Sequence, residues 1–350
     1  MRIAVVGGGF AGLSAALELA DEGAEVVLLE AADRFGGQVR TTRERGFLVE
    51  EGADGFDPGD QEVRTLIEQL RLSNDLVAPQ LLPTLVLERN NGKRALGPAT
   101  TTSTAVPPLT LRAGMGALSH AMARRLDGRV DVRVGNAVEA LARMGEGWTV
   151  YGESGPAIVV DGLVMAVPPR AAAWLLHPIS ARAARSLAAL AARSIVVVSL
   201  GYRRPDVSHP LDAAGFVVPR ERGEEGLEVC TFVTSSFSAR SPGDSVLLRV
   251  RLRPARGELA STTDEGWVET AHGMLVPILS LRRPPSVAWV ARWTDALPAV
   301  NDAYRAQVAD ARAALQECGR VELAGACYDL PGLEGAIRSG RAACRRLSVG

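Results

Sequence analysis

Residues 2–30 read RIAVVGGGFAGLSAALELADEGAEVVLLE, and this stretch decides the fold. The β-branched run Arg2–Val6 is typical of a buried parallel strand. Apolar residues between Phe10 and Ala20 recur at helical spacing, and a second buried strand is expected over Glu25–Leu29. A strand, a glycine turn, a helix and a strand within about thirty residues form a right-handed βαβ unit. The sequence therefore predicts an α/β fold built on a parallel sheet.

The turn between this first strand and its helix carries the motif Gly7-x-Gly9-x-x-Gly12. The first glycine allows the tight turn, Gly9 lets the backbone approach a pyrophosphate, and Gly12 permits close packing of helix on strand. The helix N-terminus offers unpaired N–H groups to the phosphates. Glu30 ends the second strand, where a carboxylate can accept hydrogen bonds from ribose hydroxyls. The motif predicts a dinucleotide site, but it does not separate NAD from FAD, and a glycine turn without a ligand is the alternative.

Two segments after Glu30 separate these alternatives: RFGGQVRT at 34–41 and FLVEEGAD at 47–54. They resemble the start of the flavin-dependent amine oxidase superfamily, and within it most closely the protoporphyrinogen/coproporphyrinogen oxidase branch. In that family the glycine pair lets the backbone pass close to the flavin's phosphate and ribityl chain. The segment that matches 52–55 lies beside the isoalloxazine ring. The resemblance implies FAD, and no signature for a flavin linked through cysteine is found, so non-covalent binding is expected.

The resemblance continues along most of the chain. Residues 111–118 (LRAGMGAL) are similar to the family's Gly-Met step back into the flavin domain, and the residue that matches Val138 uses its backbone to hold the adenine. Residues 292–298 (RWTDALP) resemble an Arg-Trp segment whose Trp lies near the flavin. Residues 333–340 (LEGAIRSG) match the closing signature, in which a helix N-terminus faces the flavin and its dipole stabilises negative charge on the reduced ring.

The cofactor-binding residues implied by this resemblance come from both ends and the middle of the chain. They are Gly7, Gly9, Phe10, Ala11, Gly12, Glu30, Ala31, Arg34, Gly36, Gly37, Gln38, Val39, Gly52, Ala53, Asp54, Val138, Trp293, Gly325, Leu333, Glu334, Gly335 and Ala336. Three aromatic residues, Trp293, Tyr202 and Phe232, are candidates for lining a substrate pocket, although aromatic residues on strands are also typical of a core. The sequence predicts no acid or base residue.

The predicted elements divide the chain into two domains. A discontinuous Rossmann-type FAD-binding domain is expected from 1–73, 111–168 and 291–350. A second, smaller domain of antiparallel sheet and helix is expected over 169–290. The segment 74–110 is expected to be a trimmed lid with mostly irregular structure. The porphyrinogen-oxidising branch normally inserts a long helical segment at this place in the chain.

Two residues bear on the substrate. The stretch that begins at Thr84 resembles one that opens, in the porphyrinogen branch, with an Arg thought to pair a substrate propionate. A hydroxyl cannot replace that directional, charge-assisted pair. The only lysine, Lys93, lies in the wrong segment to match the Lys that monoamine and polyamine oxidases place beside the flavin. These departures favour a compact substrate.

Composition excludes several other functions. The 350 residues include 39 basic and 40 acidic side chains, so the net charge of −1 gives no reason to expect nucleic acid or an anionic membrane as partner. The four cysteines and four histidines show no metal-ligand spacing, so no metal is predicted. No stretch is long and apolar enough for a transmembrane segment, and reduced thiols in a cytoplasmic protein are expected. A homodimer, or a partner protein that completes the lid, stays open.

Together these features predict an FAD-dependent oxidoreductase. Two electrons, formally a hydride, would pass from a C–H or N–H group of a compact biosynthetic intermediate to flavin N5, and dioxygen or a carrier would reoxidise the flavin. The alternatives are a protoporphyrinogen/coproporphyrinogen oxidase with a minimal pocket, a flavin-binding protein without turnover, and redox-neutral isomerisation.

Overall fold

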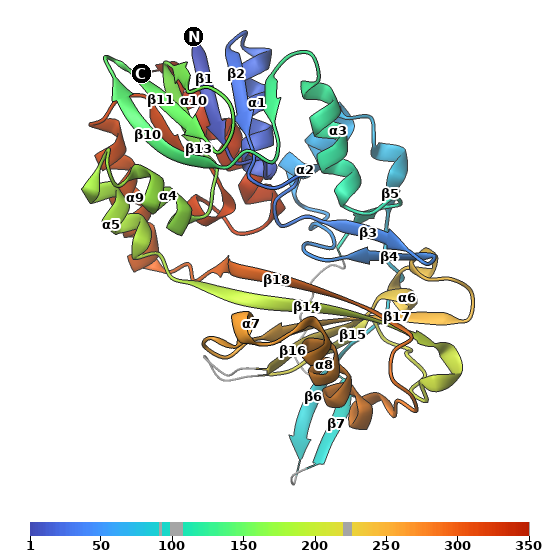
Figure 1. The fold of residues 1–350 in the computed structure, drawn as a ribbon. Helices are drawn as coiled ribbons and strands as arrows, with labels where there is room; N and C mark the ends of the chain where they lie inside the picture. The colour runs from blue at the N-terminus through green and yellow to red at the C-terminus, as the bar shows by residue number, and fades with distance from the viewer. Residues whose placement is uncertain (91–92, 99–107, 220–225, 350) are drawn as a thin grey trace.

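A five-stranded, all-parallel sheet forms the centre of one domain (Figure 1). The computed structural model describes residues 1–90, 93–98, 108–219 and 226–349. The strand order is β19-β13-β1-β2-β9, and β1 lies in register with β2, with Ile3 beside Val26 and Val5 beside Leu28. The strands are β1 (Arg2–Val6), β2 (Glu25–Leu29), β9 (Asp131–Arg133), β13 (Gly162–Met165) and β19 (Val321–Leu323). Side chains on both faces of β1, β2 and β13 are buried, which explains their continuous apolar runs.

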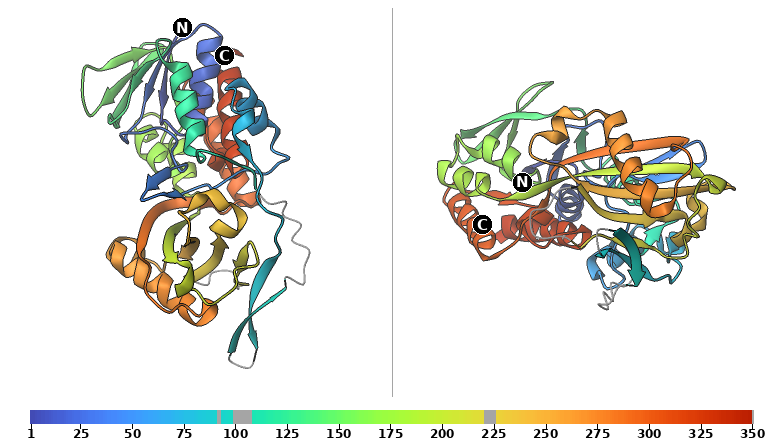
Figure 2. Two further views of the ribbon diagram at one scale, coloured as in Figure 1. Left: turned by 90° about the vertical axis from the view of Figure 1, so that its right-hand side faces the viewer. Right: turned by 90° about the horizontal axis from the view of Figure 1, so that it is seen from below.

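Four helices cover one face of this sheet and bring distant parts of the chain together. They are α1 (Phe10–Asp21), α2 (Gln61–Gln69), α3 (Gly116–Leu126) and α10 (Leu333–Val349). Helices α1 and α10 lie side by side (Figure 2). A Cβ added at Gly340 would lie 2.2 Å from the carbonyl oxygen of Ala11, so the missing side chain lets the two helices pack closely. The N-terminal glycine motif and the C-terminal helix thus belong to one core.

The other face carries a three-stranded antiparallel sheet and three more helices. These are β10 (Val138–Met144), β11 (Gly147–Gly152), β12 (Ile158–Val160), α4 (Pro169–Leu176), α5 (Ala181–Ala188) and α9 (Asp302–Gln316). The prediction that 169–188 belongs to the second domain is wrong, because the apolar side chains of α4 and α5 are buried in the core between this face and α9.

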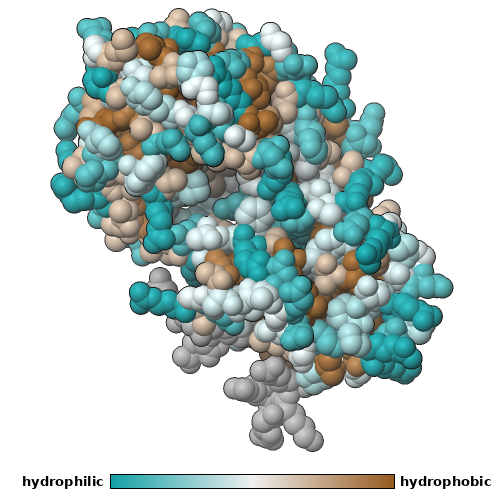
Figure 3. All heavy atoms as spheres, in the orientation of Figure 1, coloured by the Kyte–Doolittle hydropathy of each residue, from teal (hydrophilic) through white to brown (hydrophobic). Residues whose placement is uncertain are grey.

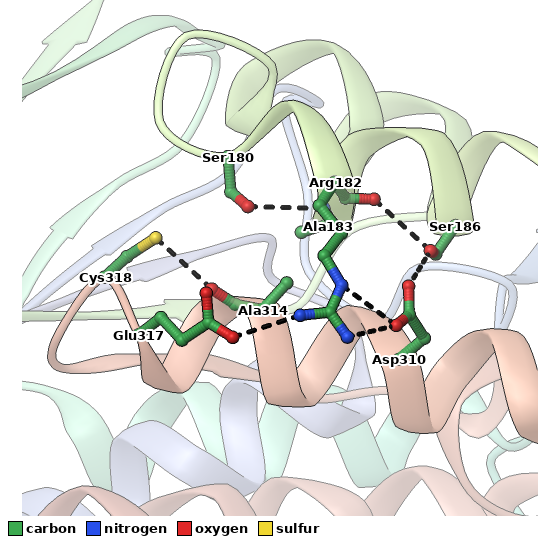
Figure 4. Close-up of polar contacts among 8 residues, drawn as sticks. All are labelled: Ser180, Arg182, Ala183, Ser186, Asp310, Ala314, Glu317 and Cys318. Carbon is green, nitrogen blue, oxygen red and sulfur yellow. Dashed lines mark hydrogen bonds and ion pairs between the residues drawn. The ribbon is translucent and has the colours of Figure 1, made fainter.

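Polar side chains fix α5 on α9 at the surface of this layer (Figure 4). Arg182 of α5 pairs with Asp310 at 2.5 Å and with Glu317 at 3.0 Å. Ser186 Oγ donates to the other oxygen of Asp310 at 2.5 Å, and Ser180 Oγ accepts from Ala183 N at the start of α5. Surface ion pairs contribute little individually, so the apolar contact is the main reason for this packing.

The second domain is built on a seven-stranded sheet in the order β18-β14-β17-β16-β15-β6-β7. Its strands are β18 (Val287–Pro298), β14 (Ala192–Arg203), β17 (Ser245–Arg253), β16 (Gly226–Phe232), β15 (Gly215–Val217), β6 (Thr84–Asn90) and β7 (Lys93–Pro98). Neighbouring strands are antiparallel, except that β15 and β6 are parallel. Helix α8 (Asp264–Leu279) covers one face, and the other face is turned toward the first domain (Figure 1). The predicted α/β fold with a second, antiparallel domain is confirmed.

The segment expected to be an irregular lid is partly regular. Strands β5 (Leu76–Val77) and β8 (Thr110–Leu111) pair with each other, and β6 and β7 form a hairpin that extends the seven-stranded sheet. Residues 91–92 and 99–107 of this segment, and residues 220–225 of the second domain, lie outside the described residues. Strand β18 crosses the predicted domain boundary at 290/291, because it stays paired with β14 up to Pro298.

Short elements complete the described chain. The hairpin β3 (Thr41–Glu44) and β4 (Phe47–Glu50) lies between the two domains, and α6 (Val233–Ser236), α7 (Glu258–Ser261) and four 3-10 turns lie in the loops. On the face drawn in Figure 3, hydrophilic residues are spread over both domains, and an indentation separates the two. Among the helices of the described ranges, none combines the length and the apolar character needed to cross a membrane.

Candidate functional site

In the glycine turn before α1, an added side chain would have room at one position and would clash with the backbone at two others. Gly7 has φ +106°, and a Cβ there would lie 2.4 Å from the oxygen of Ala166. A Cβ at Gly12 would lie 1.8 Å from the oxygen of Gly7. At Gly9 the nearest atom to an added Cβ is 3.8 Å away, and no side chain caps the helix that begins there. The N-terminus of α1 is therefore open to an anion.

Glu30 is fixed at the carboxyl end of β2 by backbone groups. Its Oε2 accepts from Gly8 N at 2.5 Å and its Oε1 from Ala32 N at 2.8 Å. The backbone N–H of Asn136 donates to the Glu30 carbonyl, so Val138 at the start of β10 lies two residues along the chain from a contact with Glu30. The structure thus places Glu30 beside the glycine turn, and the contacts of Glu30 with ribose and of Val138 with adenine remain predictions.

The next loop packs its glycine pair against the glycine turn. Gly36 N donates to Gly8 O at 2.9 Å, and Gly36 and Gly37 have φ of +108° and +56°. Arg34 donates from Nη1 to Phe35 O and Val39 O and from Nη2 to Gly37 O, at 2.9–3.1 Å. Arg34 therefore holds the loop in shape.

A series of contacts through residues 51–53 connects this loop to the second domain. Ala53 N donates to Gln38 O at 3.1 Å, and a Cβ at Gly52 would lie 1.7 Å from the same oxygen. Trp293 of β18 donates from Nε1 to Glu51 O at 2.7 Å, and its ring lies 3.3 Å from the position of a Gly52 Cβ. An elongated ligand with phosphates at Gly9 would follow this path toward Trp293.

A small cavity of about 30 Å³ lies where residues 48–54 meet the second sheet. Its lining residues come from both domains: Leu48, Glu50, Asp54, Ser199, Thr231, Val233, Phe237, Arg240, Leu247 and Arg249. The volume is enough for roughly one or two waters. Of the charged residues among them, Asp54 was predicted as a site residue, and Glu50, Arg240 and Arg249 were not.

Glu50 is the most perturbed carboxylate beside this cavity. It accepts from Met115 N at 2.8 Å and from Thr41 Oγ1 at 2.7 Å, and Arg240 Nη1 lies 3.5 Å away. Burial raises the pKa of Glu50 to about 7, although these three neighbours favour the ionised form. Burial also lowers the pKa of Arg240, whose Nη2 donates to Thr110 Oγ1 and to Leu111 O. Arg240 thereby links the second domain to β4 and β8.

The sequence does carry a signal for these charged residues. Glu50 ends the buried run Phe47–Glu50, and Arg249 interrupts the apolar strand β17. A charge inside a buried strand is typical of a paired or functional group. The tertiary partner of each charge is not visible in the sequence.

Two of the three pocket candidates are wrong. Tyr202 and Phe232 are each 1% exposed and lie in the core under α8, on the opposite side of the sheet from the cavity. The Tyr202 hydroxyl is hydrogen-bonded to His272 Nδ1 at 3.0 Å. Both faces of β14 are largely buried, so alternation could not tell which face carries the site. The Trp293 side chain, in contrast, lies on the face of the sheet that is turned toward the first domain, where it donates to Glu51 O.

The C-terminal signature residues are placed at the start of α10, but one side chain has another function. Glu334 Oε2 accepts from Glu62 N and Val63 N at 2.8 and 3.1 Å, so it caps the N-terminus of α2. Gly325 N donates to Ser339 Oγ, and a Cβ at Gly335 would lie 1.7 Å from Leu330 O. Any contact of Glu334 with a cofactor would come from its backbone.

Comparisons with known proteins identify the family. The family described as flavin containing amine oxidoreductase matches residues 10–110 and 85–348. The coproporphyrinogen III oxidase of Propionibacterium freudenreichii is 24% identical over 90% of this chain and 85% of its own length. Protoporphyrinogen oxidase 1 of Arabidopsis thaliana is 39% identical, over 33% of this chain and 22% of its own.

Solved structures agree on the fold. A protein from Exiguobacterium sp. 255-15, provisionally described as a protoporphyrinogen oxidase, has a TM-score of 0.87 with 20% identity, and 99% of this chain and 98% of that one are covered. A variant of putrescine oxidase has a TM-score of 0.81 with 15% identity, covering 100% and 99% of the two chains.

The residues present fit FAD. The space beside Gly9 and the uncapped N-terminus of α1 suit a pyrophosphate, and the fixed carboxylate of Glu30 suits a ribose. The path through Gln38 and Gly52 leads to the face of the second domain. The chain belongs to the flavin containing amine oxidoreductase family and is an FAD-dependent oxidoreductase.

Proposed function

We propose that this protein removes two electrons, formally a hydride, from a C–H or N–H group of a compact organic substrate. When bound, FAD supplies the two-electron acceptor, and dioxygen or a carrier reoxidises it. The observation that carries the proposal is the cavity of about 30 Å³ between Glu50, Asp54 and the second sheet. Sites for drug-sized ligands enclose roughly 300–1,000 Å³, whereas this space, with room for one or two waters, fits only the reacting group of a compact substrate.

An apolar cluster around Trp293 supports the exclusion of water. Ile195 and Val197 of β14 pack with Ala291 of β18, and Trp293 packs against the same group. This apolar surface is continuous with the wall that Trp293 forms beside Gly52. A small apolar or amphipathic substrate would be desolvated here, next to the end of the predicted cofactor path.

The segment between α2 and α3 supports the same substrate class. Its described residues form a one-turn 3-10 helix, two short strands and the β6–β7 hairpin. The alignment with the Propionibacterium oxidase spans 458 positions, which exceeds the 350 residues of this chain, so that relative contains segments without a counterpart here. A broad substrate such as a tetrapyrrole would need additional walls.

A second candidate function is oxidation of a porphyrinogen in a minimal pocket. It is favoured by the relatives, since those from Propionibacterium freudenreichii and Bacillus subtilis are both named coproporphyrinogen III oxidase. The Bacillus subtilis alignment covers 67% of this chain and 49% of the relative. The residues that would clamp a propionate differ, because Thr84 opens β6.

One experiment separates these functions. The purified FAD-loaded protein is mixed under argon with a panel of alkylamines, amino acids and hydroxy acids, and bleaching of the flavin absorption is recorded. In parallel, coproporphyrinogen and protoporphyrinogen are incubated with the enzyme and porphyrin fluorescence is followed. Bleaching by a compact compound supports the first function, and fluorescence above the autoxidation rate supports the second. Retained FAD with neither response contradicts both and indicates a flavin-binding protein without turnover.

A further inference from the structure

Arg249 of β17 extends from the second domain into the segment 50–54 of the first. Its Nε donates to Glu50 O at 3.1 Å, its Nη2 donates to Gly52 O, and its Nη1 pairs with Asp54 Oδ2 at 3.1 Å. The side chain of Arg249 is 12% exposed, so solvent weakens these contacts little. The planar guanidinium offers donors in fixed directions, which is why one side chain can satisfy three acceptors at once.

The neighbouring carbonyl is also held from the second domain. Trp293 of β18 donates to Glu51 O, so three consecutive carbonyls, those of Glu50, Glu51 and Gly52, accept from side chains of β17 and β18. On its other side the segment is held through Ala53 N, which donates to Gln38 O in the loop beside the glycine turn. The shape of 50–54 therefore depends on the second domain.

We propose that Arg249 is a positioning residue that sets the conformation of segment 50–54 and the direction of the Asp54 carboxylate at the flavin end of the site. This inference rests on the proposed function, because it assumes that FAD follows the path from Gly9 through Gln38 to Gly52. Arg249 thereby couples the attachment of the second domain to the surroundings of the cofactor.

The chain contains a matched control on the same strand. Arg251 lies two residues further along β17 and points to the same face. Its Nε pairs with Glu228 Oε2 at 3.0 Å, within the second domain. Both residues are arginines of β17 with a carboxylate partner. The partner of Arg251 is Glu228, which lies outside segment 50–54. A substitution at Arg251 therefore reports what the loss of a β17 arginine does in general.

The test compares the FAD-loaded wild type with R249Q, R249K and R251Q. FAD affinity is measured by reconstitution of the apoprotein, the flavin environment by its visible spectrum, and its midpoint potential by equilibration with a redox dye. We expect R249Q to weaken FAD binding about tenfold, since charge-assisted hydrogen bonds to the segment are lost, and to shift both spectrum and potential. R249K restores the positive charge without the planar set of donors and should fall between, and R251Q should match the wild type.

Two results would overturn the inference: a yellow R249Q protein with unchanged affinity, spectrum and potential, or equal changes in R249Q and R251Q. If R249Q does not fold, the comparison of R249K with R251K decides in the same way, because both keep a positive charge. Failure of the proposed function has a different signature, since the wild type itself would then lack bound flavin or reduction by any compact compound.

Discussion

Glu50→Gln should change how stability depends on pH. Burial raises the pKa of Glu50 from 4.5 to about 7, so the folded protein holds this proton more tightly than the unfolded chain does. Raising the pH from 4.5 to 7 therefore ionises Glu50 first in the unfolded chain and lowers the free energy of unfolding. Glutamine keeps nearly the same shape but cannot ionise, so the variant should lose this part of the pH dependence.

The magnitude follows from the difference between the two pKa values. Each unit corresponds to about 1.4 kcal/mol, so the wild type should lose about 3 kcal/mol relative to Glu50→Gln between pH 4.5 and pH 8. With an unfolding entropy of roughly 2 cal/mol/K per residue, this is about 4 °C in Tm for a chain of this length. The attraction of Arg240 for the ionised carboxylate is already included in the pKa of about 7, so this magnitude needs no separate correction for it.

The assay is thermal unfolding of FAD-loaded wild type and variant at several pH values, at one scan rate. The quantity of interest is the difference in Tm between the two proteins as a function of pH. Other titrating groups are common to both proteins and cancel in this difference. A difference in Tm that stays constant from pH 4.5 to pH 8 would refute the assignment of a buried, proton-holding Glu50.

Four further substitutions test the cofactor path and the corrected residue roles. Gly9→Ala should fold normally but bind FAD at least tenfold more weakly in reconstitution, because its methyl group has room yet fills the space for the phosphates. Gly12→Ala should unfold at lower denaturant, by about 2–4 kcal/mol, since its Cβ would lie 1.8 Å from Gly7 O. Glu334→Ala should cost about 1 kcal/mol in chemical denaturation while the flavin content of the purified protein stays unchanged. Trp293→Phe should destabilise by about 1 kcal/mol through the lost hydrogen bond, and a red or blue shift of the flavin band should accompany it.

The first thirty residues could be interpreted from sequence because every local signal agrees there. The strand, the glycine turn and the helix are each encoded by neighbouring residues, and Glu30 is held by backbone groups within two residues and by Gly8. The proximity of α1 and α10 could be inferred only through the family resemblance, since it depends on a contact such as Gly340 on Ala11. Local pattern and family resemblance together predicted the cofactor half of the site.

The remainder depended on tertiary contacts that no local pattern encodes. The apolar residues of the Ala-rich helix α5 show that one of its faces is buried, but not that α9 is the partner. The β6–β7 hairpin was missed because its apolar residues are few and its partner β15 is distant in sequence. Tyr202 and Phe232 were named as pocket candidates with a core position as the alternative, and the sequence could not separate the two because the strands are buried on both faces.

The packing of α10 against α1 also governs when the protein can assemble during synthesis. The first βαβ unit is translated well before β19 at the sheet edge and α10 on its helical face. The core that shapes the dinucleotide turn therefore stays incomplete until α10 has emerged from the ribosome, and these sequence-distant contacts make folding slow. Loading of the prosthetic group has to wait for α10, and nascent chains stalled before α10 should accumulate in a colourless, chaperone-dependent form.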